Sequence, residues 1–88
     1  MAVTVFINSQ DDIRVTVYTK PSCVQCTATT KALDERSIVY SLIDLTKDAV
    51  AMSFIQSLGY RQVPVVVVGS DHWVGFRPDK IDELSVAF

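Results

Sequence analysis

The sequence predicts an α/β domain with one mixed, four-stranded sheet, in the element order β-α-β-α-β-β-α, with helices on both faces. Two observations predict this class. In the first part of the chain, β-rich segments alternate with segments whose apolar residues recur at helical spacing. Further on, a nearly continuous apolar run is followed by a turn and a short return segment. A strand–helix–strand unit gives a parallel pair with a right-handed crossover, and the later hairpin adds antiparallel strands.

The first strand and helix flank a short polar loop. The alternating segment Ile13–Thr19 is typical of a strand, and the proline-containing loop 20–22 ends it. Ser22 is a candidate N-cap for a helix from Val24 to about Arg36. The inward face of this helix is expected to carry Cys26, Thr29, Ala32 and Leu33.

The second strand and helix follow the same pattern. Ile38–Asp44 is the expected strand, and Thr46 with Asp48 in the first turn marks the next helix start. Gly59 is expected to end this helix as its C′ residue. Its predicted apolar stripe consists of Val50, Ala51, Phe54, Ile55 and Leu58.

The remaining elements form a hairpin and a closing helix. Val63–Gly69 is typical of a strand covered on both faces, the turn is 69–71, and His72–Phe76 is the return strand. Pro78 suits the first position of a helix with Asp79 in its first turn. The expected inward residues are Ile81, Leu84 and Phe88.

Residues 1–12 form an extension in front of the domain, which we place at 13–88. Val3–Phe6 nearly repeats Val15–Tyr18, and a polar link separates the two segments. Five linking residues span about 17 Å, enough to pass one neighbouring strand. The extension is therefore either an extra strand at the sheet edge or a loosely held segment of strand-like composition.

Composition restricts the class of protein. The chain has 88 residues, of which 49% are hydrophobic, so it makes one small domain with a core of its own. Its formal net charge is −2 with acids and bases interspersed, which argues against a nucleic-acid partner. Two cysteines are too few for a secreted disulfide framework. We expect a cytoplasmic monomer without a signal peptide or membrane partner.

The motif Cys23-Val24-Gln25-Cys26 carries the chemistry. It stands between a strand and a helix, where unpaired N–H groups and the helix dipole favour a thiolate. A lowered thiol pKa makes a cysteine nucleophilic near neutral pH. The alternative is a zinc site, for which only His72 could add a ligand within one chain, so that two chains would be needed. The motif favours dithiol–disulfide exchange without a metal.

The two cysteines have different expected roles. Cys23 lies nearer the helix start and is expected to attack a substrate disulfide, and the inward Cys26 then resolves the mixed disulfide. Lys20 either stabilises the thiolate by its charge or is an ordinary solvated lysine.

Two further segments are candidates for partner binding. A cis Val63–Pro64 bond would leave the Val63 backbone free to pair with an extended substrate, whereas a trans proline would only start the strand. Trp73 and Phe76 pack the hairpin or, if exposed near the thiols, form a docking site. Arg77 is expected to be structural.

From about Arg14 to the end, the chain resembles the glutaredoxin-like NrdH-redoxins of the thioredoxin superfamily. The resemblance rests on four ordered motifs, which are 17–20, the Cys23–Cys26 segment, 59–66 and 73–79. It implies a thioredoxin-like fold, a cis Pro64, Cys23 as the nucleophile, and no cofactor beyond the Cys23–Cys26 disulfide. Val24, Gln25, Val63, Pro64, Trp73 and Phe76 are the residues that we assign to partner binding.

The resemblance also implies electron transfer from NADPH, through thioredoxin reductase, to the large subunit of class Ib ribonucleotide reductase. The bulk of Gly75-Phe76-Arg77 opposes close binding of glutathione. The chain departs from the family where Val74 replaces a usual serine. The alternatives are a glutathione-dependent glutaredoxin and a binding module that holds zinc or an iron–sulfur cluster between two chains.

Overall fold

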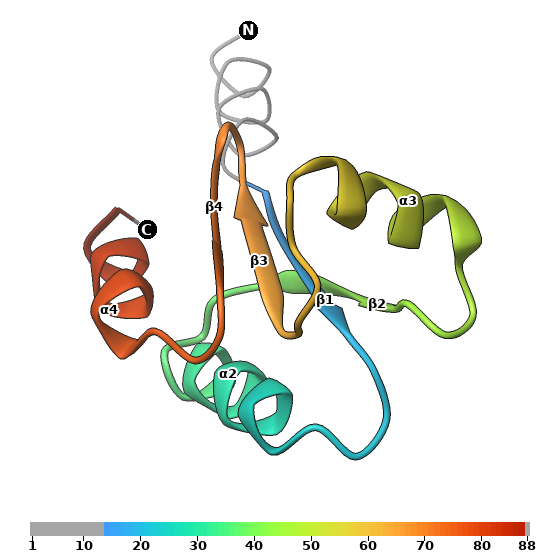
Figure 1. The fold of residues 1–88 in the computed structure, drawn as a ribbon. Coiled ribbons are helices and arrows are strands. Elements are labelled where there is room, and N and C mark those ends of the chain that lie inside the picture. The colour runs from blue at the N-terminus through green and yellow to red at the C-terminus, as the bar shows by residue number, and fades with distance from the viewer. Residues whose placement is uncertain (1–13, 88) are drawn as a thin grey trace, which may run out of the picture.

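A computed structural model of the chain describes residues 14–87 (Figure 1). The elements follow the predicted order: β1 (Val15–Thr19), α2 (Val24–Glu35), β2 (Tyr40–Asp44), α3 (Ala49–Ser57), β3 (Val65–Val68), β4 (Asp71–Val74) and α4 (Pro78–Ala87). The last three strands are shorter than predicted, and β2 begins at Tyr40 rather than at Ile38. β3 begins only after Pro64, which has no N–H to donate to the sheet, and β4 ends before Gly75. The extension 1–12, Ile13 and Phe88 lie outside the described residues.

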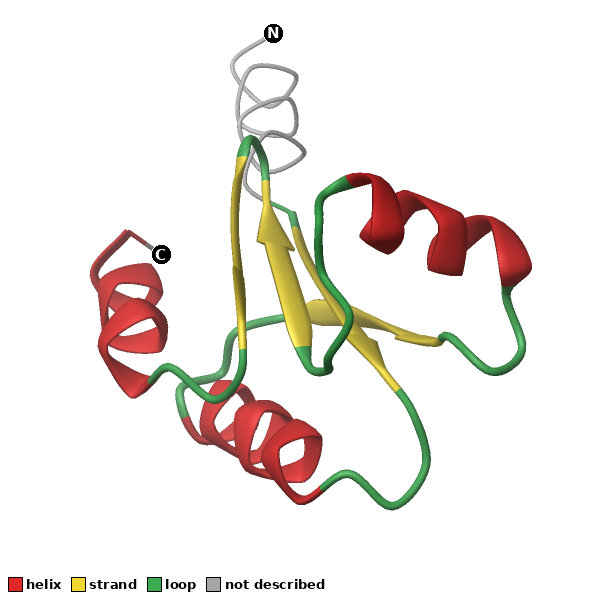
Figure 2. Ribbon diagram, viewed as in Figure 1, coloured by secondary structure: helices red, strands yellow, loops and turns green. Residues whose placement is uncertain are grey.

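The sheet is mixed, as predicted, with the strand order β2-β1-β3-β4. β1 and β2 are parallel, with Val17 opposite Leu42, and β3 is antiparallel to both β1 and β4. Helices α2 and α4 cover one face of the sheet and α3 covers the other (Figure 2). Among the residues described, no helix is both long and apolar enough to cross a membrane.

The larger core lies between the sheet and the helices α2 and α4. The predicted inward face of α2 is confirmed, because Cys26, Thr29, Ala32 and Leu33 are all buried. Since the face of α2 that carries Cys26 is anchored in this core, the start of the helix has a fixed position relative to the sheet. The core residues are Val15, Val17, Ala32, Leu33, Ile38, Val66, Trp73, Ile81 and Leu84.

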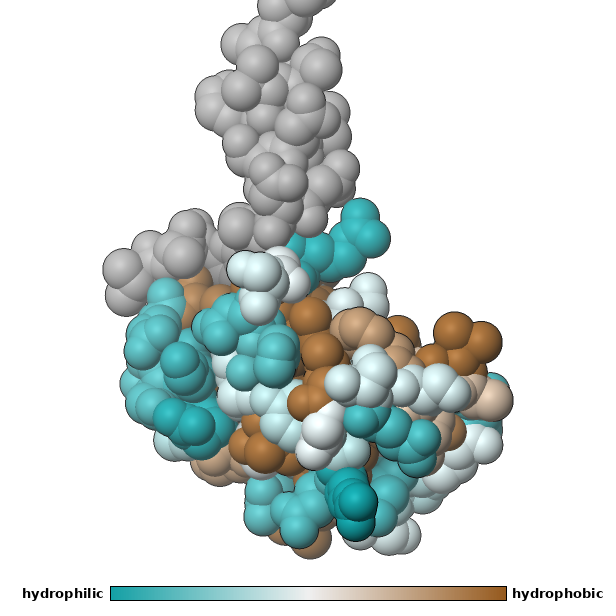
Figure 3. Space-filling view, turned by 45° about the horizontal axis from the view of Figure 1, so that its top comes forward, coloured by the Kyte–Doolittle hydropathy of each residue, from teal (hydrophilic) through white to brown (hydrophobic). Residues whose placement is uncertain are grey.

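The core under α3 is smaller, and part of the predicted stripe is wrong. Ala51 and Ile55 are buried, whereas Val50 is 81% exposed and Phe54 41% exposed. Each exposed residue is one position, or about 100° of helix, away from a buried one. A single helix on a small sheet buries only a narrow face, so this flank stays at the surface. Figure 3 shows hydrophobic residues that interrupt the polar surface. Phe54 packs against Tyr18, with the ring centroids 5.9 Å apart.

Candidate active site

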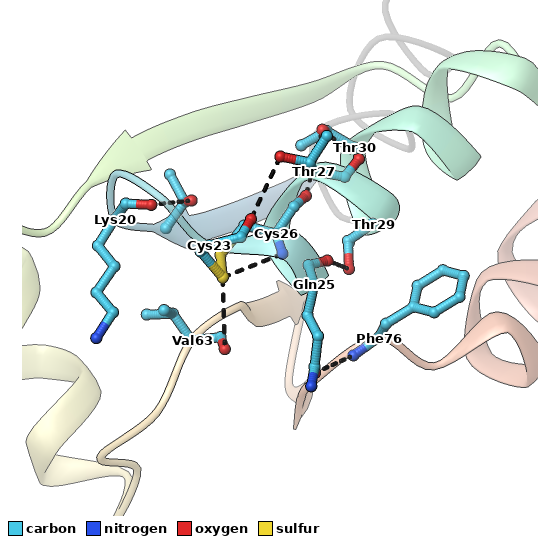
Figure 4. Close-up of a disulfide and its surroundings, with 10 residues drawn as sticks. Lys20, Cys23, Gln25, Cys26, Thr27, Thr29, Thr30, Val63 and Phe76 are labelled. Atoms are coloured by element: carbon cyan, nitrogen blue, oxygen red, sulfur yellow. Dashed lines mark hydrogen bonds between the residues drawn. A yellow bond between two sulfur atoms is a disulfide. The ribbon is translucent and has the colours of Figure 1, made fainter.

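The two cysteines lie at the start of α2. Cys23 is the N-cap residue, with extended backbone angles, and its Sγ accepts a hydrogen bond of 3.1 Å from the Cys26 N–H (Figure 4). Ser22, the candidate cap from the sequence, instead has a φ of 61° and turns the chain into the helix. Cys23 and Cys26 form a disulfide with their Cα atoms 5.2 Å apart. The N-cap acceptor of α2 is therefore the Cys23 sulfur itself.

The two sulfurs differ in access from solvent. Cys26 is 4% exposed and belongs to the buried face of α2, whereas Cys23 is only half-buried. Thr27 and Thr30 donate hydroxyl hydrogen bonds of 3.3 Å to the carbonyls of Cys23 and Cys26. An incoming sulfur can thus approach Cys23, while Cys26 is shielded behind it.

The loop before β3 faces the disulfide. The Val63–Pro64 peptide bond is cis, which is the first of the two alternatives raised by the sequence. The Val63 carbonyl oxygen lies 3.9 Å from Cys23 Sγ (Figure 4). On the other side of the loop, the Pro64 carbonyl accepts a 2.8 Å hydrogen bond from the Gly75 N–H. The backbone of Val63 is therefore held beside the reactive sulfur.

Gln25 joins the start of α2 to the segment after β4. Its Oε1 accepts a 3.3 Å hydrogen bond from the Phe76 N–H. Gly75 has a φ of +87°, and a Cβ at that position would lie 3.3 Å from the same oxygen. Phe76 is 38% exposed and Val24 84% exposed, so both present apolar surface on the segments that Gln25 joins.

The partner-binding assignment of Trp73 is wrong. Its side chain is 5% exposed and packs in the core under α2 and α4, because it faces the same side of the sheet as Val66, its partner on β3. Its Nε1 has no hydrogen-bond partner among the described residues. The Lys80 ammonium lies 6.0 Å from the ring centroid, within reach of a cation–π contact. Trp73 thus packs the hairpin, which is one of the two interpretations that the sequence allowed.

Arg77 and Lys20 have different surroundings. The Arg77 guanidinium holds Asp79 through two hydrogen bonds of 3.1 and 2.8 Å, and these lower the pKa of the Asp79 carboxyl. This contact links the two residues that flank Pro78 at the start of α4. Lys20 is exposed and lines the same recess as Cys23. Within residues 14–87 the structure records no ion pair for Lys20, so its charge would act on the sulfur from a distance.

His72 makes a side-chain contact of its own. Its Nδ1 lies 2.7 Å from the Tyr60 hydroxyl, with the two rings edge to face. Across residues 14–87 no group of three or more His, Cys, Asp or Glu side chains is placed to hold a metal ion.

Fold and site together define a class of protein. A C-x-x-C disulfide on the first turn of a helix, opposite a cis proline, on this four-stranded sheet is the arrangement of a thioredoxin-fold thiol–disulfide oxidoreductase. Comparison with known families sharpens this assignment. The glutaredoxin family model matches residues 15–73, and the chain belongs to the glutaredoxin family, among its glutaredoxin-like NrdH members.

Individual relatives agree with this assignment. The chain is 40% identical over 75 residues to the glutaredoxin-like protein NrdH of Escherichia coli K12, covering 85% of this chain and 93% of the relative. It is 31% identical to the Lactococcus lactis MG1363 protein of the same name, over 81% of this chain and 99% of the relative. The solved structure of NrdH-redoxin from Escherichia coli, described as having a thioredoxin-like activity profile, superposes with a TM-score of 0.79 at 40% identity. That match covers 82% of this chain and 95% of the other.

Proposed function

We propose that this oxidoreductase takes electrons from NADPH through thioredoxin reductase and passes them to a protein disulfide in the cytoplasm. The proposed target is the large subunit of class Ib ribonucleotide reductase. One observation carries the proposal. An accessible Cys23 sulfur caps α2 beside the Val63 backbone, and the resolving Cys26 is buried one helical turn behind it.

The reaction consists of two exchanges. In the reduced chain, the Cys23 thiolate attacks one sulfur of the substrate disulfide and forms a mixed disulfide, and the other substrate sulfur leaves and takes up a proton. Cys26 then loses its proton and attacks Cys23 Sγ. The internal disulfide forms, and the second substrate sulfur leaves as a thiol. Two electrons and two protons reach the substrate. A dithiol of the reductase restores the pair by the reverse exchanges.

The capping geometry makes Cys23 the nucleophile. Its sulfur already accepts the Cys26 N–H, and a thiolate there would also interact with the positive end of the α2 dipole. Lys20 adds a positive charge in the same recess. The Val63 backbone offers pairing groups to an extended substrate in the manner of strand addition, and Pro64 fixes that backbone. Val24, Gln25 and Phe76 form the partner-facing surface around the sulfur.

The surroundings of Phe76 support a protein partner over glutathione. Gln25 occupies the Phe76 N–H, and the exposed ring adds bulk where a small peptide would have to approach. The related Escherichia coli protein has a thioredoxin-like activity profile, which is the behaviour proposed here.

A comparison of electron sources tests the proposal. The oxidised chain is incubated with NADPH and either thioredoxin reductase or glutathione with glutathione reductase, and NADPH oxidation is followed with a protein disulfide as acceptor. We expect turnover with thioredoxin reductase and little with glutathione. Turnover with glutathione and its reductase, together with none with thioredoxin reductase, would contradict the proposed electron donor. Reconstitution with a class Ib ribonucleotide reductase then tests the proposed target.

A further inference from the structure

A groove opens on the α3 side of the site. It has a volume of about 580 Å³ and lies between α3, the loop after β2 and the loop 59–63. Its residues include Lys20, Met52, Tyr60, Arg61 and Val63. Leu45 and Ile55, which are 6% and 2% exposed, form an apolar floor. A groove of this size holds several side chains.

The groove carries the opposite charge to the chain. The chain has a net charge of −2, yet the described residues that line the groove include two cations, Lys20 and Arg61, and no carboxylate. The acids nearest along the chain, Asp44 and Asp48, do not line the groove. Asp44 accepts the Thr46 hydroxyl at 2.6 Å, and Asp48 accepts the Ala51 N–H at 2.9 Å. The groove therefore favours an anionic ligand.

The groove is continuous with the reactive sulfur. Val63 lines the groove, and its carbonyl oxygen is 3.9 Å from Cys23 Sγ. Lys20 lines both the groove and the recess that holds Cys23. An extended chain advances about 3.3 Å per residue. A substrate that pairs with Val63 and presents its cysteine to Cys23 would thus place residues two or three positions away in the groove.

We propose that the groove binds the stretch of a protein substrate that flanks its reactive cysteine, and that a Glu or Asp two or three residues from that cysteine pairs with Arg61 and Lys20. The inference rests on the proposed function and adds a substrate class to it, namely extended segments with acidic residues beside the disulfide. Arg61 is then a specificity-determining residue, because its forked guanidinium suits a carboxylate.

Matched peptide substrates test this inference. Two peptide disulfide dimers differ only in Glu or Gln at the positions two and three residues from the cysteine, on both sides. The pre-reduced chain is mixed with each dimer, and the released peptide thiol is quantified by chromatography. We expect a second-order rate constant about two- to fivefold higher for the acidic dimer, the range of a solvent-exposed ion pair. This advantage should shrink as salt is added.

Two variants locate the effect. Arg61→Gln should bring the ratio of the two rate constants close to one. Lys31→Gln removes the same charge from an exposed site on α2 outside the groove and should keep the ratio. Equal rates for both dimers, an unchanged ratio in Arg61→Gln, or faster reduction of glutathione disulfide than of the acidic dimer would overturn the inference while leaving the oxidoreductase intact. Failure to reduce either dimer would overturn the proposed function as well.

Discussion

Helices α2 and α3 begin with the same hydrogen bond, made by different atoms. At α2, Cys23 Sγ accepts the N–H of Cys26 at 3.1 Å, and at α3, an Asp48 carboxylate oxygen accepts the N–H of Ala51 at 2.9 Å. Both cap residues have extended backbone angles. A carboxylate is negative throughout the neutral range, whereas a sulfur is negative only when it is reduced and deprotonated. Equivalent backbone donors therefore stabilise the folded helix start at α3 and a reactive thiolate at α2.

The surroundings of the two caps also differ, because Cys23 is placed to meet a partner and Asp48 is not. Cys23 faces the Val63 backbone and a recess open to partners. Asp48 acts on a buried neighbour, Tyr18. The pKa of the Tyr18 hydroxyl is raised mainly by burial and, to a smaller extent, by the negative charge of Asp48. The Cys23 cap thus faces a recess that a partner can enter, whereas the exposed Asp48 cap acts only on the structure beside it.

The largest expected effect comes from removing the reactive sulfur while keeping the cap. Serine is a good N-cap residue, so Cys23→Ser should leave the stability of the reduced protein within about 0.5 kcal/mol, measured by urea unfolding with a reductant present. Disulfide reduction should fall below detection. Detectable disulfide reduction by Cys23→Ser would contradict the assigned roles.

The resolving cysteine gives the next effect. Cys26→Ser should accumulate a mixed disulfide between Cys23 and a protein substrate, because the second exchange cannot occur. Mass spectrometry under non-reducing conditions measures the adduct, and Cys23→Ser is the matched control, in which none should form.

The pH dependence of alkylation sharpens the contrast between sulfur and carboxylate. In the reduced protein, Cys23 should react with iodoacetamide with a pH midpoint below that of an unperturbed thiol, which lies at about 8.5. Lys20→Gln should raise this midpoint if the lysine charge supports the thiolate. A midpoint at or above the ordinary value would contradict a dipole-stabilised nucleophile.

At α3 the cap should affect stability alone. Asp48→Ala is expected to cost about 1 kcal/mol of unfolding free energy, whereas Asp48→Asn should retain most of it. Reductase activity at a temperature where both variants are folded should match the parent chain. A loss of reductase activity in folded Asp48→Ala would show that the two helix starts are not independent.

The smallest effect is expected at the third helix start. The Arg77 contact lowers the pKa of Asp79, so it stabilises the folded state at neutral pH, and this contribution is lost as the pH falls through the folded-state pKa. Because both side chains are exposed, Arg77→Gln should lower the Tm less than Asp48→Ala does. The difference from the parent should vanish in acid. A larger loss would indicate a further role for Arg77.

Much of this arrangement is encoded in local sequence. The period of Cys26, Thr29, Ala32 and Leu33 identifies the buried face of α2, and the cysteine spacing identifies the chemistry. The identity of the cap is not encoded locally, because Ser22 and Cys23 are both suitable and only the backbone turn at residue 22 decides between them.

Other features depend on tertiary contacts. The side of the sheet that Trp73 faces depends on the register of β4 against β3, which the sequence of the hairpin leaves open. Val50 and Phe54 stay at the surface because the sheet beneath α3 is small. Arg61 could not be singled out from the sequence, because it comes to line the same groove as Lys20 only when the loop 59–63 folds against α3. The available signal was one cation shortly before each motif, Lys20 before the C-x-x-C motif and Arg61 before Val63-Pro64.

The close approach of Gly75 to Gln25 has an evolutionary consequence. Any side chain at position 75 would have to adopt a positive φ and would meet the Gln25 amide oxygen. Gly75 therefore cannot be replaced freely while Gln25 is kept, whereas Gln25 could be shortened without a clash. Across natural variants of this chain, residues 25 and 75 should covary, with a shorter residue in the C-x-x-C motif accompanying any replacement of the glycine.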